Sequence, residues 1–245
     1  MLRRIVGPLL LAVLQGAFSL GAAMYQKPDW RWWASIVGTA TLGVVFAALV
    51  TIAAEKGHRA KMKLDVENIL QAAMIELSTE VGLEPQDISL RAFKVSRSAS
   101  TFWLQKEQRS IGVIRQRRGV PPLTIRWREG VGVIGRCWKT KHEVQRIPLS
   151  GLAELSQADW GKLDPDARMG FSWEQWLSLR ERYHGLVAYP IVEQRGYPGR
   201  YRYWGCVALG AFAEEAWVKM HRERRDATNA QLGNAAASIL GALKA

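Results

Sequence analysis

The sequence predicts an α+β protein in which an N-terminal transmembrane helical hairpin precedes an antiparallel sheet flanked by helices. Two observations predict this class. Two charge-free apolar stretches, residues 5–25 and 32–54, lie close together near the N-terminus. After residue 54, apolar residues recur first at helical spacing, then in short alternating runs, and finally at helical spacing again.

Each apolar stretch is long enough to cross a bilayer. At about 1.5 Å rise per residue, a helix over either stretch covers about 30 Å, the thickness of the hydrocarbon core. Only residues 26–31 separate the two, so residues 1–54 are expected to form a tight hairpin of two transmembrane helices. A cleaved signal peptide is the alternative for the first stretch, because two arginines precede it and small residues lie near its end.

The flanking charges predict the orientation of the hairpin. Arg3 and Arg4 precede the first stretch, and Lys56, Arg59 and Lys61 follow the second. The loop between the stretches has a weaker positive balance. By the positive-inside rule, both termini and the soluble domain are expected to lie in the cytoplasm, at the plasma (inner) membrane.

Small residues within the hairpin indicate close helix contacts. Gly16, Gly38 and Gly43 each belong to a pair of small residues at four-residue spacing, which lets two helices approach closely. Gln15 is the most polar residue in either stretch and could form a hydrogen bond between subunits. These four residues are candidates for transmembrane assembly, and packing within a single hairpin is the alternative.

The rest of the chain has the pattern of one α+β domain. Residues 55–82 are expected to contain the juxtamembrane segment and the first domain helix, which Gly82 would end. Residues 83–245 are expected to form the sensing domain, with an irregular insert at 150–185 and a closing helix at 213–244. Strands are predicted, in chain order, at residues 88–95, 101–105, 111–115, 123–127, 186–192 and 203–212.

Charge and cysteine content narrow the choice of partners. The formal net charge is +12, which indicates an anionic partner: lipid headgroups, a small anionic ligand or nucleic acid. The membrane tether favours lipid for the juxtamembrane lysines, and direct nucleic-acid binding is not expected. Two cysteines, Cys137 and Cys206, are too few for a disulfide scaffold and are expected to be reduced core thiols.

The sequence contains no recognisable catalytic constellation. The four histidines are scattered, and the HExxH, CxxC, GxSxG and GxxxxGK[ST] motifs do not occur. Gly130, Gly132 and Gly135 have the spacing of a dinucleotide loop. No βαβ unit surrounds them, so a turn between strand and helix is the better interpretation. Acidic residues in the insert fit a solvated loop better than a metal site. The sequence therefore predicts neither an enzyme nor a bound cofactor or metal.

Three groups of residues are candidates for ligand binding. One is Arg136, Trp138 and Lys139 near the start of the helix after the glycines, where free N–H groups could bind an anion, with a core position for Trp138 as the alternative. Basic residues on neighbouring strands and on the helix after the glycines could share a face and bind phosphate through arginine forks. Tryptophans of the insert could stack on a ring of the ligand. The candidates are Arg115, Arg126, Arg136, Trp138, Lys139, Trp160, Trp173 and Trp176. The alternatives are a solvated, lipid-facing basic surface and tryptophans that only hold the insert against the sheet.

Two passages resemble the GAF domain family. Residues 127–138 (WREGVGVIGRCW) look like the family's segment in which a strand runs through glycines into a short helix, and residues 183–212 look like its paired final strands. With the flanking helices, the resemblance covers most of residues 60–245. It implies a ligand pocket that the insert covers, but the Asn-Lys-Phe-Asp-Glu signature of cyclic-nucleotide-binding members does not occur.

The layout of two spans and one cytoplasmic domain resembles the two-transmembrane effectors of bacterial nucleotide-signalled anti-phage defence. That resemblance implies a sensor that binds a small anionic, nucleotide-like second messenger. It implies that the sensor signals through assembly of its hairpin, with membrane disruption as the output. The chain is expected to act as a homo-oligomer. The alternative is a non-lytic, GAF-like membrane adaptor that dimerises and recruits a signalling partner.

Overall fold

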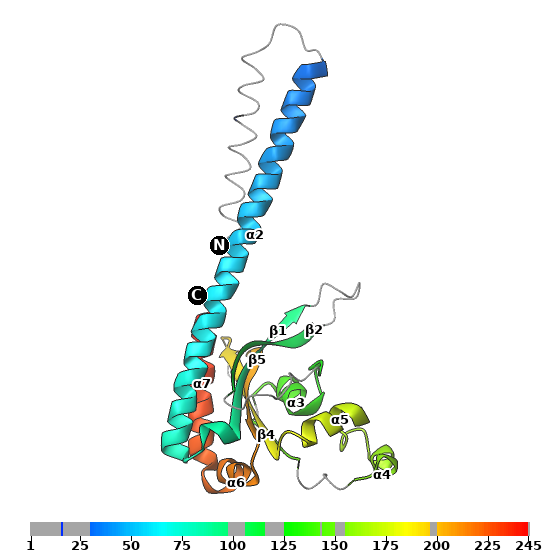
Figure 1. Cartoon of the computed structure of the whole chain (residues 1–245), viewed down its shortest axis with the longest axis vertical. Coiled ribbons are helices and arrows are strands. Elements are labelled where there is room, and N and C mark those ends of the chain that lie inside the picture. Colours follow the sequence, from blue (N-terminus) through cyan, green and yellow to red (C-terminus); the bar gives the residue numbers. More distant parts are fainter. Residues whose placement is uncertain are drawn as a thin grey trace. The chain divides into compact units, whose positions relative to one another are not determined.

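The computed structural model describes Gly16 and residues 30–97, 106–115, 125–142, 144–149, 155–196 and 200–244. The protein is α+β, with a five-stranded antiparallel sheet and helices (Figure 1). The chain divides into two compact units, residues 1–61 and 62–245, and the boundary lies within helix α2 (Trp30–Glu76).

The first unit contains the N-terminal part of α2. By length and composition, this helix is the one in the described residues that could cross a membrane, and none of its apolar window is buried. Leu42 and Phe46 are 72% and 64% exposed, which is unusual for large apolar side chains unless lipid or protein covers them. The predicted span 32–54 lies within α2, whereas the predicted span 5–25 lies outside the described residues except for Gly16.

The candidate assembly residues are only partly described. Gly38 and Gly43 lie on α2, and Gly16 is helical and exposed. Gln15 lies outside the described residues, so its proposed hydrogen bond between subunits stays a prediction.

The second unit is built on the sheet. Its strands, in chain order, are β1 (Ile88–Arg97), β2 (Lys106–Arg115), β3 (Gln145–Pro148), β4 (Gly185–Gln194) and β5 (Tyr201–Ala211). They lie in the order β2-β1-β5-β4-β3, and all neighbours are antiparallel. The strands predicted around β1, β2, β4 and β5 are confirmed, whereas β3 was not predicted.

The strand predicted at 123–127 is wrong for the residues that the structure describes. Trp127 forms only an isolated bridge with Gln108, whose backbone N–H donates to the Trp127 carbonyl at 2.9 Å. The chain then turns at Gly130, where φ is 84°, so the pairing with β2 cannot continue. The strand predicted at 101–105 lies outside the described residues.

The first domain helix ends where it was predicted to end, but it is not a separate helix, because α2 runs without a break from Trp30 to Glu76. After α2, a π-helical turn (Leu77–Val81) ends at Gly82, as predicted, and a 3-10 turn (Pro85–Asp87) leads into β1. Helix α3 (Gly132–Thr140) follows the glycine turn. The insert, predicted to be irregular, contains two helices, α4 (Gln157–Lys162) and α5 (Trp173–Arg180). Ser156 and Ser172 cap their N-termini, which is a common way to satisfy the first free N–H groups.

The closing helix is interrupted, which corrects the prediction of one continuous helix. It consists of α6 (Glu214–Val218), a π-helical turn (Lys219–Glu223) and α7 (Arg225–Lys244). Arg146 of β3 donates from Nη1 to the Met220 carbonyl at 2.8 Å. That carbonyl would otherwise accept from the Arg224 N–H, which instead donates to Lys219, five residues back. A side chain that enters the hydrogen-bond ladder in this way breaks a helix.

Residues of β5 contribute to two cores on opposite faces of the sheet. Val207 and Leu209 face a core shared with the last turns of α2, the π-helical turn after it and α7, whereas Cys206 and Ala208 face a core shared with α3 and α5. Figure 1 shows the two helix layers on either side of the strands. Cys137 and Cys206 are free and fully buried in the second core, in agreement with the prediction of core thiols.

Candidate anion-binding site

A hollow of about 970 Å³ lies between the C-terminal end of α3 and the β4–β5 hairpin. We call it the basic hollow. Its lining residues are Lys139, Thr140, Lys141, His142, Arg195, Gly196, Arg200, Tyr201 and Arg202. Five of these nine carry a positive charge, and none of the described lining residues is acidic.

Backbone geometry positions the basic side chains. Lys141 follows α3 with a φ of 66°, and its N–H donates to the Cys137 carbonyl, so the chain leaves the helix sharply and presents Lys141 and His142. On the other side, the Arg195 N–H donates to the Arg200 carbonyl at 2.8 Å. That bond closes the hairpin and brings Arg195 and Arg200 next to each other.

Aromatic contacts join the two sides of the basic hollow. Trp138 of α3 stacks on Tyr203 of β5 with 6.2 Å between the ring centroids. His142 and Tyr201 also stack, at 5.8 Å. Successive residues of a strand point to opposite sides, so Tyr201 and the pair Arg200 and Arg202 lie on opposite sides of the end of β5.

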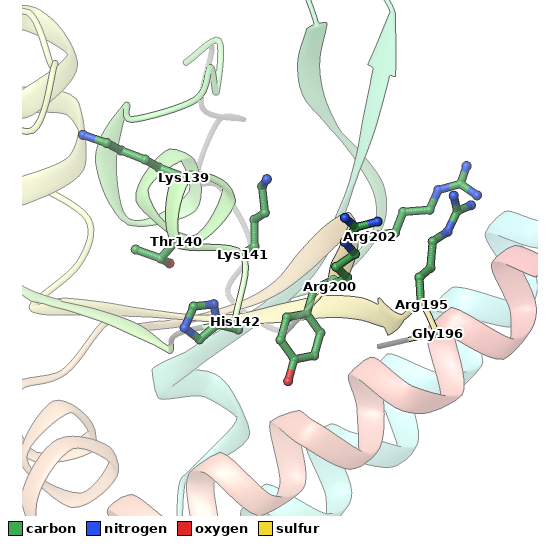
Figure 2. Close-up of a pocket in the computed structure, with 9 residues that line it drawn as sticks. Lys139, Thr140, Lys141, His142, Arg195, Gly196, Arg200 and Arg202 are labelled. Carbon is green, nitrogen blue, oxygen red and sulfur yellow. The ribbon is translucent and has the colours of Figure 1, made fainter. Parts of the chain in front are cut away.

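The charged ends come from two elements. Figure 2 shows Arg195, Arg200 and Arg202 extending from the hairpin and Lys141 extending from the turn after α3, whereas Lys139 points away from the arginines. All five charged side chains are exposed. An arginine fork can hold two oxygens of one phosphate, so this arrangement suits a ligand with more than one anionic group.

One carboxylate lies beside the basic hollow without lining it. Glu193 of β4 pairs with Lys244, with 2.6 Å between Oε1 and Nζ. It also accepts a hydrogen bond from Trp204 Nε1 at 3.1 Å. The hydrogen bonds from Lys244 and Trp204, and then the charge of Arg195, lower the pKa of the Glu193 carboxyl. Glu193 therefore carries a negative charge at neutral pH.

Among the basic candidates whose side chains the structure describes, only Lys139 lines the basic hollow. Trp138 lies next to it, 8% exposed and stacked on Tyr203. Arg126 is exposed on the segment after residue 124. Arg115 is the last residue of β2, and its side chain lies outside the described part of the structure.

Arg136 contacts the insert, where its side chain donates from Nη2 to the Asp166 carbonyl. The insert also covers the N-terminus of α3, where the Gly132 N–H donates to the Met169 carbonyl at 2.7 Å. A Cβ at Gly132 would lie 2.2 Å from the Phe171 ring. The glycine segment is therefore a tightly packed turn, which was the preferred interpretation, and its N–H group is engaged by protein rather than open to an anion.

The tryptophans of the insert pack on one another. Trp160 stacks on Trp176 with 4.9 Å between the centroids, and Trp173 lies 6.0 Å from Trp160. Trp160 and Trp176 are 3% and 0% exposed. Arg180 lies over the Trp173 ring at 5.9 Å. This arrangement fits the alternative in which the tryptophans hold the insert against the sheet.

The interior between the sheet and the insert helices is nearly filled. The cavity there, lined by residues such as Phe93, Trp127 and Tyr183, measures about 20 Å³, which is room for at most a water molecule. Its size does not accommodate a nucleotide-like ligand in this conformation. The described residues also contain no group of three or more His, Cys, Asp or Glu that could hold a metal ion.

Six residues that line the basic hollow were not predicted from the sequence: Lys141, His142, Arg195, Arg200, Tyr201 and Arg202. A signal was present, because two short turn segments, KTKH at 139–142 and RGYPGR at 195–200, are rich in basic residues. Their proximity was not visible in the sequence. No protein-family model, curated protein or solved structure matches the chain, so the function of the site is argued from its geometry.

Proposed function

We propose that this chain is a membrane-anchored sensor whose second unit binds a small phosphate-bearing, nucleotide-like anion in the basic hollow. One observation carries the proposal: five lysines and arginines line a hollow of about 970 Å³ whose described lining contains no acidic residue. Like charges held close together repel one another, so an anion placed between them is favoured.

The chemistry of the hollow supports a ligand with at least two phosphate groups. Each charge-assisted contact to a phosphate contributes about 1.5–3 kcal/mol, and small-molecule sites have volumes of about 300–1,000 Å³. Tyr201 is 38% exposed and gives the hollow an aromatic edge on which a base can stack. The proposal assigns the chain no reaction of its own.

The anchor in this proposal is a two-helix hairpin formed by residues 5–25 and the apolar part of α2, with a GAF-like domain behind it. The exposed apolar side chains of α2 and the basic residues after them support a cytoplasmic position for the second unit. In the effector form of the proposal, ligand binding makes the domains assemble, and the assembled hairpins disrupt the membrane.

The adaptor is the second candidate, and one observation favours it. Leu64 and Ile75 are 58% and 56% exposed and lie about three helical turns apart on one face of α2. These two exposed apolar side chains could contact a second copy or a signalling partner, and the polar residues Asn68 and Gln71 lie between them on the same side of the helix. An adaptor would use the same ligand but would not damage the membrane.

A thermal-shift measurement on the full chain tests ligand binding. The chain is placed in phosphatidylcholine nanodiscs and heated with tripolyphosphate, mononucleotides or cyclic dinucleotides. A ligand that binds only the folded state raises the melting temperature, and no shift with any of them would contradict the proposal. A second arm uses discs containing phosphatidylserine: stabilisation there without soluble ligand would identify lipid headgroups as the phosphate source.

Dye release from liposomes separates the effector from the adaptor. Leakage that requires the ligand found in the thermal screen, and that is lost in Gln15→Leu or Gly16→Leu, is expected for the effector. Binding without leakage favours the adaptor. Protease added to sealed inside-out vesicles should digest the second unit in both cases, because both place it in the cytoplasm.

A further inference from the structure

A continuous series of contacts joins the basic hollow to the last turn of α7. The Arg202 guanidinium lies over the Trp204 ring, with 4.0 Å between Cζ and the ring centroid. The Trp204 indole N–H donates to Glu193, and Glu193 pairs with Lys244 of α7. The series begins at a residue that lines the hollow and ends on a helix that contributes to the first core together with α2.

Arg195 connects the basic hollow electrostatically with Glu193. It lines the basic hollow, and its charge also acts on Glu193, two residues earlier in the chain. An anion in the hollow and the Glu193 carboxylate therefore both attract Arg195. Lys244 decides how strongly Glu193 attracts it, because a carboxylate that already pairs with one cation attracts a second cation less.

Building on the proposed function, we infer that Glu193 competes with the bound anion for the hollow's arginines and that Lys244 regulates this competition. With Lys244 in place, α7 neutralises Glu193, and the arginines are available to the anion. When the last turn of α7 moves away, the Glu193 carboxylate is no longer neutralised and attracts Arg195 more strongly. The affinity of the hollow for the anion then falls. Coupling between two sites is reciprocal, so a bound anion stabilises the pairing of Lys244 with Glu193 and the docking of α7.

The size of the coupling follows from the exposure of the pair. The Lys244 and Glu193 side chains are 43% and 25% exposed, and solvent weakens such pairs. We expect each substitution to change the dissociation constant about two- to fivefold.

A double-mutant cycle on the full chain tests the inference. Tripolyphosphate is titrated by calorimetry into nanodiscs of phosphatidylcholine at low salt, with wild type, Lys244→Gln, Glu193→Gln and the double variant. Lys244→Gln is expected to weaken binding and Glu193→Gln to tighten it, and the double variant is expected to bind like Glu193→Gln. Lys162→Gln is the matched control. Lys162 also forms an exposed ion pair, with Asp159 at 3.0 Å, but neither residue lines the hollow. The Lys162→Gln variant should bind tripolyphosphate with wild-type affinity.

A conformational readout accompanies the cycle. Tripolyphosphate should slow hydrogen exchange of the amides at residues 240–244 in wild type and not in Glu193→Gln. An effect of Lys244→Gln that persists in the Glu193→Gln background would overturn the inference, because Lys244 would then act only as a nearby charge. Equal affinities for all four proteins would also overturn it. Absence of tripolyphosphate binding to wild type would instead overturn the proposed function on which the inference rests.

Discussion

The indole of Trp138 lies parallel to the phenol ring of Tyr203, with 5° between the two planes. Trp138 immediately precedes Lys139 at the end of α3, and Tyr203 immediately follows Arg202 at the start of β5. The stack therefore holds together the two segments, distant in sequence, that line the basic hollow.

Removing one ring of this stack should damage both folding and binding. We expect Trp138→Ala to lower the free energy of unfolding by about 3 kcal/mol and to weaken tripolyphosphate binding, because α3 is no longer held against β5. Tyr203→Phe keeps the stack but loses the hydroxyl that donates to Gln108 at 3.1 Å, at a cost of about 1 kcal/mol. Calorimetry should show wild-type affinity for Tyr203→Phe; an equal loss in both variants would contradict this role of the stack.

Arg136→Ala distinguishes the basic hollow from a site under the insert. If the anion binds in the hollow, Arg136→Ala should leave the affinity for tripolyphosphate within about twofold of wild type, because its side chain contacts the Asp166 carbonyl. A site under the insert predicts a loss of tenfold or more. Trp176→Leu should lower the melting temperature without changing the affinity, because Trp176 is fully buried.

The pairing of β1 with β5 depends on a glycine. A Cβ at Gly205 would lie 1.8 Å from the Phe93 carbonyl oxygen, so Gly205→Ala should lower the free energy of unfolding by at least about 2 kcal/mol. Gly241→Ala is the control, because a Cβ at this exposed position of α7 meets nothing within 4 Å. It should stabilise the protein by about 0.5–1 kcal/mol. Denaturation followed by circular dichroism measures both, and similar effects at the two sites would contradict the described register.

His221 should make folding sensitive to mild acid. Burial, followed by the charges of Arg146, Arg225 and Arg222, lowers the pKa of His221 below its ordinary value of 6.5. The folded protein then binds a proton less readily than the unfolded chain, so the free energy of unfolding falls as the pH drops below about 6.5. Between pH 7.5 and 5.5, His221→Gln should lose stability less steeply than wild type.

Local patterns in the sequence predicted the elements that bury one face over several residues. Val66 and Leu70 of α2 and Leu77 of the π-helical turn after it recur on one face and are fully buried. The alternating apolar residues of β1 likewise mark the face that the strand buries. β3 is only four residues long and ends at Pro148, so it carries too little alternation to detect. The capping serines of α4 and α5 were visible in the sequence and could have been used to predict these two helices.

The candidate site depends on contacts between distant segments. Lys141 and Arg200 lie in separate turns, and the stacks of Trp138 on Tyr203 and of His142 on Tyr201, together with the pairing of β4 with β5, bring them together. The break in the closing helix has a similar cause, since Arg146 reaches it from β3. Composition predicted an anionic partner, but the position of the basic hollow required the tertiary structure.

The most direct test of the account is a calorimetric titration of tripolyphosphate into the full chain in phosphatidylcholine nanodiscs. The first double variant, Arg195→Ala with Arg200→Ala, removes two positive charges from the basic hollow. The second, Arg222→Ala with Arg224→Ala, removes two positive charges from exposed positions that do not line the hollow. We predict that the first pair weakens binding at least about tenfold, whereas the second leaves it within about twofold of wild type. Equal affinities for the two double variants would contradict an anion site in the basic hollow.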